Sequence, residues 1–201
     1  MKRRILTVAL SLALVALLVT GASLAYFTDE ATVTNTFTIG NVDIELAEPA
    51  WVQNSKLVPN AEIPKDPTVT VKANSEDCYV RLLVTISPAD KTDELIPLTE
   101  NTITTVFKGY DATNWLLKKN TKNNDNTRTY EFWYKAKVAS SASDQPLDAL
   151  FDALVVPANL DGDEIKALKD LTITVKAEAI QSAGTNGDMT METAFAALDA
   201  E

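Results

Sequence analysis

Apolar and polar side chains alternate along much of this chain, and this alternation restricts the fold more than any other feature. From Ala31 to Ile39, threonines hold every even position, so they share one side of an extended chain, as the period of two in a β-strand requires. The apolar residues on the other side are Ala31, Val33, Phe37 and Ile39, and Phe27 extends this row. A free N-terminal strand over residues 26–39 can complete its own sheet or that of another molecule.

The same alternation returns downstream. Gly40 and Asn41 interrupt the first run, and Val42–Leu46 then alternates as a second strand. Apolar residues also hold every second position in 78–86, 130–138 and 171–179. The run 78–86 is apolar on both sides, which favours a central strand, and its Cys78 is predicted to be a buried small hydrophobe. Shorter strands are predicted at 68–73, 115–118 and 147–156.

Helical signals are few. Residues 103–110 show a helical stripe with Thr99 as its candidate cap, residues 161–168 suit one or two helical turns, and Thr190 is placed to cap a last helix. Seven or eight strands with long connections and two or three short helices predict an all-β fold, an antiparallel jelly-roll or Greek-key sandwich of two sheets. An N-terminal signal helix is expected to precede a single domain over residues 26–201.

The first 25 residues have the layout of a secretory signal peptide. Lys2, Arg3 and Arg4 form a basic start, and an uncharged run follows to Thr20. Small residues at Ser23 and Ala25 fit a signal peptidase, which predicts cleavage before Tyr26. The alternative is an uncleaved membrane anchor over residues 5–24. A secreted protein is expected, with signal peptidase as a partner during export and membrane contact only through the leader.

Charge and cysteine content narrow the class further. Cleavage would leave 176 residues with 15 basic and 28 acidic side chains, a net charge of −13. Such a balance repels nucleic acid and anionic membranes, so neither is an expected partner. The single cysteine excludes an intramolecular disulfide.

No catalytic residue is expected. The chain has no histidine, whereas zinc peptidases generally hold the ion through imidazoles, and the serine and cysteine triads need one as a base. We expect no cofactor. Asp161, Asp163 and Glu164 are weak candidates for calcium ligands, because they lack EF-hand spacing, and a solvated turn leading into a helix fits them better.

Five aromatic residues offer a choice between a sugar-binding surface and core packing. Alternation with polar residues favours the core for most of them, and the aromatic side of 130–138 is expected to face inward, with Trp133 on the opposite side. The five are Trp51, Tyr79, Trp115, Trp133 and Tyr134.

Several segments resemble the TasA/camelysin family of secreted Gram-positive proteins. They are Ala25–Asp29, Thr36–Ile44, Asp77–Arg81 and Ala177–Ser182, and the specific signal is concentrated in the first 45 residues. The resemblance implies a leader removed by a dedicated signal peptidase, a jelly-roll domain, and a biofilm-matrix or cell-surface role. In that role each subunit donates an N-terminal strand to the next subunit, and the subunits polymerise. Some members of the family are described as metallopeptidases.

The leading hypothesis is therefore a secreted structural subunit of extracellular fibres or a surface layer, in which Val33, Phe37 and Ile39 fill pockets of an acceptor. Its expected partners are other copies of itself or a paralogous subunit, and a matrix polysaccharide. Three alternatives remain: the strand folds back and the protein is monomeric, the protein is a cell-surface adhesin, or it is a camelysin-like metallopeptidase.

Overall fold

The computed structural model describes residues 41–51, 56–184 and 187–200. The signal peptide, the cleavage residues and the candidate donor strand lie outside the described residues, so the predictions for Ser23, Ala25, Tyr26, Phe27, Ala31, Val33, Phe37 and Ile39 stay predictions.

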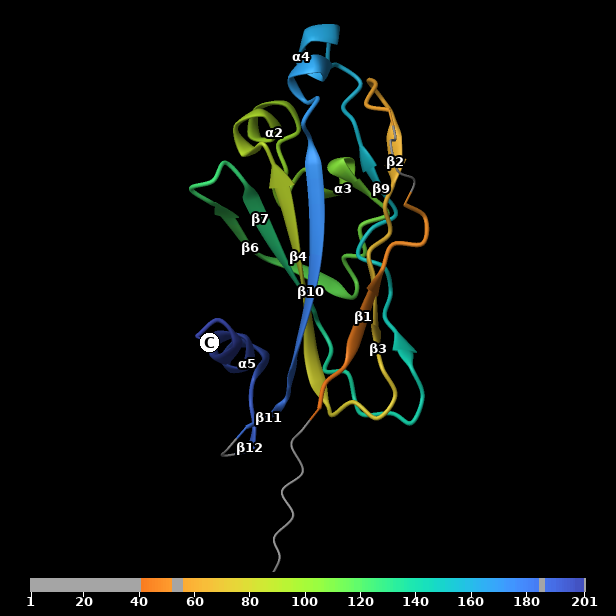
Figure 1. Ribbon diagram of the computed structural model, residues 1–201, viewed down its shortest axis with the longest axis vertical. Coiled ribbons are helices and arrows are strands. Elements are labelled where there is room, and N and C mark those ends of the chain that lie inside the picture. Colours follow the sequence, from red (N-terminus) through yellow and green to blue (C-terminus); the bar gives the residue numbers. More distant parts are fainter. Residues whose placement is uncertain (1–40, 52–55, 185–186, 201) are drawn as a thin grey trace, which may run out of the picture. The chain divides into compact units, whose positions relative to one another are not determined.

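Four long strands form the larger sheet (Figure 1). Its order is β10 (Thr172–Gln181), β4 (Cys78–Ser87), β7 (Arg128–Tyr134) and β6 (Trp115–Lys122), and every pair is antiparallel. The prediction that the run from Cys78 is a central strand is confirmed, because β4 pairs on both sides.

The second layer consists of two three-stranded sheets. One contains β1 (Ile44–Ala47), β3 (Thr68–Val71) and β8 (Gln145–Pro146), and the other contains β2 (Glu62–Pro64), β9 (Ala153–Val155) and β5 (Phe107–Lys108). Strand β11 (Ala183–Gly184) pairs with β12 (Gly187–Asp188). All of these pairs are antiparallel as well, and the all-β sandwich is confirmed.

The core lies between the layers. Cys78 and the alternate residues of β4 after it are at most 6% exposed, because strand geometry sends every second side chain to the same face. Opposite them the rings of Phe107 and Phe151 stack with centroids 4.0 Å apart. From β7, Tyr130 and Phe132 are buried on the same side, so the predicted inward aromatic face is confirmed and Cys78 is buried as expected.

Four short helices are present in the described residues, where two or three were predicted. They are α2 (Ala89–Leu95), α3 (Ile103–Val106), α4 (Gly162–Ala167) and α5 (Met191–Leu198). The prediction missed α2, because its largely polar sequence shows no apolar stripe. It also extended α3 too far and placed the cap at Thr99, whereas Thr102 holds the N-cap position. No helix of the described residues is long and apolar enough to cross a membrane.

Candidate functional site

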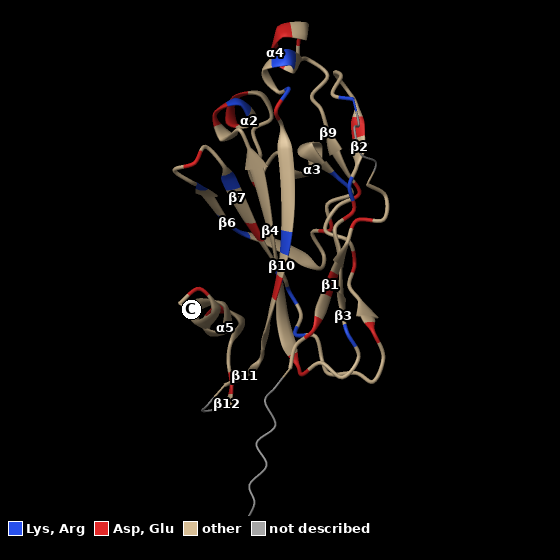
Figure 2. Cartoon of the chain, in the orientation of Figure 1, with Lys and Arg blue, Asp and Glu red and all other residues tan. Residues whose placement is uncertain are grey.

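Strand β10 forms one edge of the four-stranded sheet, and no described strand pairs with its outer side. It is ten residues long, has no proline, and keeps an unbroken register with β4. Figure 2 shows β10 almost free of charge colours, and its charged residues are Lys176 and Glu178. A long, regular and weakly charged edge of this kind is able to pair with another strand.

The core-facing side of β10 is incompletely covered. Ile173, Val175 and Ala177 are only half-buried, although their neighbours across the ladder on β4 are buried. Ile44 and Leu46 of β1, the edge strand of the facing sheet, are half-buried too. We call the border between β10 and the strands β1 and β2 the seam; β1 lies close to β10 along it, and the side chains there are only partly covered.

An apolar hollow of about 90 Å³ lies at the Leu171 end of this seam. Its lining comes from β10, β2, β9 and the segment before β2, and comprises Trp51, Leu57, Ile63, Lys65, Leu154, Leu171 and Ile173. Lys65 is only 4% exposed. Its Nζ lies 2.7 Å from Oε1 and 2.8 Å from Oε2 of Glu48, and 4.7 Å from the centroid of the Trp51 ring. The ion pair and the cation–π contact neutralise and cover the ammonium, so the hollow presents mainly apolar atoms.

The described chain enters the domain at the opposite end of the seam. The amide of Glu76 donates to the carbonyl of Asn41 over 2.9 Å, just before β4 starts at Cys78, which pairs with Gln181 at the end of β10. Figure 1 shows β1 beginning beside the lower end of β10. The described chain therefore begins at the Gln181 end of the seam, and the hollow lies at the Leu171 end.

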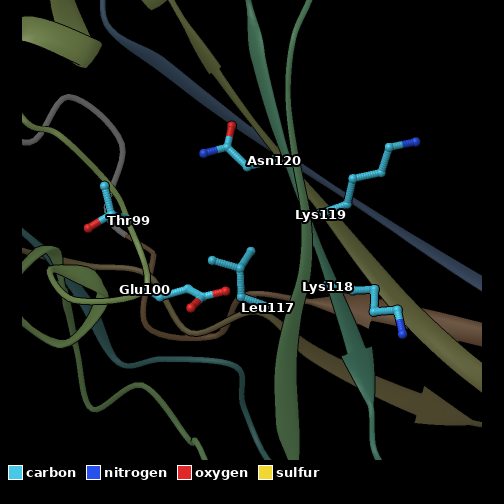
Figure 3. Close-up of a pocket in the computed structure, with 6 residues that line it drawn as sticks. All are labelled: Thr99, Glu100, Leu117, Lys118, Lys119 and Asn120. Carbon is cyan, nitrogen blue, oxygen red and sulfur yellow. The ribbon is translucent and has the colours of Figure 1, made fainter.

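The other edge of the sheet is built differently. Strand β6 has a register shift between Leu117 and Lys119, and Lys118 lies at this bulge. A pocket of about 200 Å³ lies here, and Figure 3 shows the side chains of Leu117 and Asn120 on the side of Thr99 and Glu100. The side chains of Lys118 and Lys119 point away from them (Figure 3). Bulges and lysines are devices that keep an edge from pairing, which leaves β10 as the better acceptor.

The outer face of the sheet carries a cluster centred on Arg81, which is 4% exposed. Its guanidinium donates to carboxylates of Glu131 (3.1 Å), Glu178 (2.7 Å) and Asp199 (2.5 Å). Burial disfavours the charge on Arg81, but hydrogen bonds to Asp199 and Glu178 outweigh burial and hold its pKa above the ordinary value. Helix α5 packs over the cluster, and the Phe195 ring lies 4.9 Å from Arg81 Cζ.

The Arg81 cluster fixes α5 to the sheet and was not predicted. Its signal in the sequence is one arginine inside an otherwise apolar strand, since a buried charge requires partners. The Phe195 ring also lies 4.9 Å from the ring of Trp133, which is 7% exposed. The Trp133 side chain, predicted to face away from the aromatic row, therefore packs under α5.

The acidic candidates occupy a helix start. The Asp161 carboxylate accepts hydrogen bonds from the amides of Asp163 and Glu164, and the Glu164 side chain accepts from the amide of Asp161. This reciprocal capping box uses two of the three carboxylates for the backbone, and Asp163 contacts Lys166. Within the described ranges, no group of three or more His, Cys, Asp or Glu side chains could hold a metal ion.

The five aromatic candidates do not gather on one surface. Trp115 and Trp133 are buried, Tyr79 and Tyr134 are half-buried, and Trp51 is 42% exposed beside the hollow. The indole of Trp115 donates to the carbonyl of Asp148 over 2.9 Å. Core packing therefore accounts for most of these rings, and Trp51 is the one that borders the seam.

The fold and the site define an all-β sandwich whose distinctive described feature is a pairing-competent edge strand beside an apolar hollow. Residues 1–87 match the family model described as camelysin metallo-endopeptidase. The resemblance to the TasA/camelysin family is thereby confirmed, on a match that covers less than half of the 201 residues. No curated protein and no solved structure matches the chain.

Proposed function

We propose that the mature chain is a secreted, non-catalytic structural subunit that assembles into extracellular fibres or a surface layer. Signal peptidase releases it between Ala25 and Tyr26. Residues 26–39, the N-terminal arm, then pair with the β10 edge of another copy or of a paralogous subunit. Backbone hydrogen bonds of the new ladder supply affinity, and the apolar row of the arm covers the half-buried row of β10 and sets the register.

The asymmetry between the two edges of the large sheet carries this proposal. Ten consecutive residues of β10 keep register without a bulge, while β6 is blunted by a bulge and lysines. The half-buried row of β10 faces the core, and no described strand pairs with the outer side of β10. A strand that adds to an edge satisfies both the backbone groups and these side chains, which is the usual mode of β-augmentation.

Deletion of Tyr26–Asn35 tests the proposal. The mature chain is expected to form fibres visible by electron microscopy, and the truncated chain is expected to stay soluble with the same far-UV circular dichroism. A matched pair of point variants sharpens the test: Val33→Asp places a charge on the apolar side of the arm and should abolish fibres. Thr34→Asp places the same charge on the other side and should retain them. Fibres from the truncated chain would refute strand donation.

A metallopeptidase is the second candidate, because the matching family model carries that description. The absence of histidine from all 201 residues speaks against it, since a catalytic zinc ion is usually held by imidazoles with one position left open. Hydrolysis of casein or gelatin by the purified mature protein, lost with a chelator and restored by zinc, would establish the peptidase instead.

A binding module is the third candidate, and the exposed ring of Trp51 favours it over the other aromatics. Saccharides stack on exposed rings, so a monomeric adhesin or a matrix-polysaccharide contact would use this surface. The arm-deleted monomer separates the two roles. Retention on cell-wall polysaccharide that a Trp51→Ala variant loses would support the binding module.

A further inference from the structure

We propose that the donated arm runs antiparallel to β10 and places Phe37 in the hollow at the Leu171 end of the seam. This inference rests on the proposed strand donation and adds its direction and register. Phe37 then lies opposite Ile173, and Thr36 lies opposite Thr174.

The direction follows from where the arm leaves its own domain. The arm is continuous with Asn41, which lies at the Gln181 end of β10. In a parallel pairing, the last residues of the arm would reach the Gln181 end of the acceptor, so the same ends of the two domains would meet. That geometry suits a back-folded monomer or a reciprocal pair, whose symmetry closes.

In an antiparallel pairing, the last residues of the arm reach the Leu171 end of the acceptor. The Gln181 end of one domain then meets the Leu171 end of the next, and the same contact can repeat indefinitely. A head-to-tail contact of this kind generates an open chain. We therefore assign the antiparallel direction to fibre growth by strand donation.

The register follows from side-chain size along β10. The hollow at Leu171 and Ile173 has a volume of about 90 Å³ and a mainly apolar lining, and Phe37 and Ile39 are the large pair at the end of the arm that arrives there. With Phe37 opposite Ile173, Ile39 lies opposite Leu171. Toward the other end, Val33 and Ala31 lie opposite the small residues Ala177 and Ala179, which pack against the core in the same inward row as Ile173 and Val175.

The outer face supports the same register. Thr174 is paired with Thr85, Thr85 with Thr129, and Thr129 with Thr121, so one threonine row crosses all four strands. Within this row the hydroxyl oxygens of Thr85 and Thr129 lie 3.0 Å apart. Thr36 opposite Thr174 extends the row to a fifth strand, and directly opposed threonines are favourable cross-strand pairs.

Engineered disulfides in the full mature chain test direction and register together. Opposed residues of an antiparallel pair have Cα atoms about 4.5–5.5 Å apart, within the range for a disulfide. A Thr36→Cys/Thr174→Cys variant should therefore give a ladder of covalent oligomers on non-reducing gels after fibre formation. Thr32→Cys/Thr174→Cys is the matched control, because its residues are displaced by about 13 Å along the strand and should not cross-link.

A third variant, Thr28→Cys/Thr174→Cys, reports the parallel alternative with Phe27 in the hollow. Its cross-linking in place of the Thr36 variant would overturn the proposed direction while leaving strand donation intact. Fibres that give no ladder with the Thr36 variant would overturn the register. Fibres from the arm-deleted chain would refute strand donation itself, and this inference with it.

Single alanine variants provide a second measurement that needs no engineered cysteine. Phe37→Ala removes the group that fills the hollow, and the protein concentration needed for fibre formation should rise at least about 30-fold, as for a buried interface anchor. Phe27 lies beyond the paired part of the arm, so Phe27→Ala should change the protein concentration needed for fibre formation little. An equal or larger effect of Phe27→Ala would contradict the assignment.

Discussion

Replacing Arg81 by methionine should strongly destabilise the domain. The change removes a side chain that is 5% exposed and leaves the carboxylates of Glu131 and Glu178, 11% and 16% exposed, without their guanidinium. Breaking a buried ion pair by removing one partner costs about 3–5 kcal/mol. For a domain of this size that loss corresponds to a fall in Tm of roughly 6–20 °C.

The loss should depend on pH. Burial works to raise the pKa of Glu178, but hydrogen bonds to Lys176 and Arg81 outweigh burial and hold that pKa below its ordinary value of 4.5. In the native protein this contribution to stability is complete above pH 4.5 and is lost as the pH falls through the lower folded value. In Arg81→Met, Glu178 keeps only its contact with Lys176, and protonation removes the cost of burying its remaining charge. The difference in stability between the two proteins should therefore narrow from pH 7 to pH 4.

Urea unfolding followed by circular dichroism and tryptophan fluorescence measures this difference at both pH values. Lys176→Met is the matched control, because Lys176 also contacts Glu178, at 2.6 Å, but is 69% exposed. Exposed pairs contribute less than about 1 kcal/mol. Equal urea midpoints for Arg81→Met and Lys176→Met, or an Arg81→Met deficit of the same size at pH 4 and pH 7, would refute the role given to the cluster.

Three further outcomes are expected. Burial raises the pKa of Cys78 to about 11. This thiol should therefore react with a disulfide reagent at pH 8 only as fast as the protein unfolds. Rapid reaction in the native state would contradict the buried position of Cys78. Asp161→Ala should lower the free energy of unfolding by about 1 kcal/mol, because it removes the α4 cap, and Asp163→Ala should lower it less. Calorimetry should detect no calcium binding to the native protein at millimolar concentration. Calcium binding that both variants lose would revive the calcium site. Phe195→Ala should release α5 and shift the emission of Trp133 to longer wavelength, without loss of the far-UV β signal; unchanged emission would show that α5 stays docked.

Long periodic segments were predictable from the sequence, and very short ones were not. The strand from Cys78 and the helix capped by Thr190 both contain enough residues for a period to show. Strands β2, β5 and β8 have only two or three residues each. Pairing with a distant partner creates these strands, so local alternation does not reveal them.

The candidate site was predictable only in its parts. Alternation predicts a strand for 171–179, but not that this strand lies at an edge, because edge position depends on which distant strands pair. The hollow likewise joins Trp51 to Ile173, which are far apart along the chain. Nothing in the local sequence indicated that Lys65 would be buried against Glu48.

The contrast between β10 and β6 has a consequence for the form of any assembly. If each copy offers one arm and its sheet accepts one strand, its valence is two, and a polymer built this way is linear and unbranched. The bulge and the lysines of β6 disfavour the addition of a second copy at that edge, which would widen the sheet. Such a polymer would be a string of globular beads, without the continuous cross-strand ribbon of an amyloid.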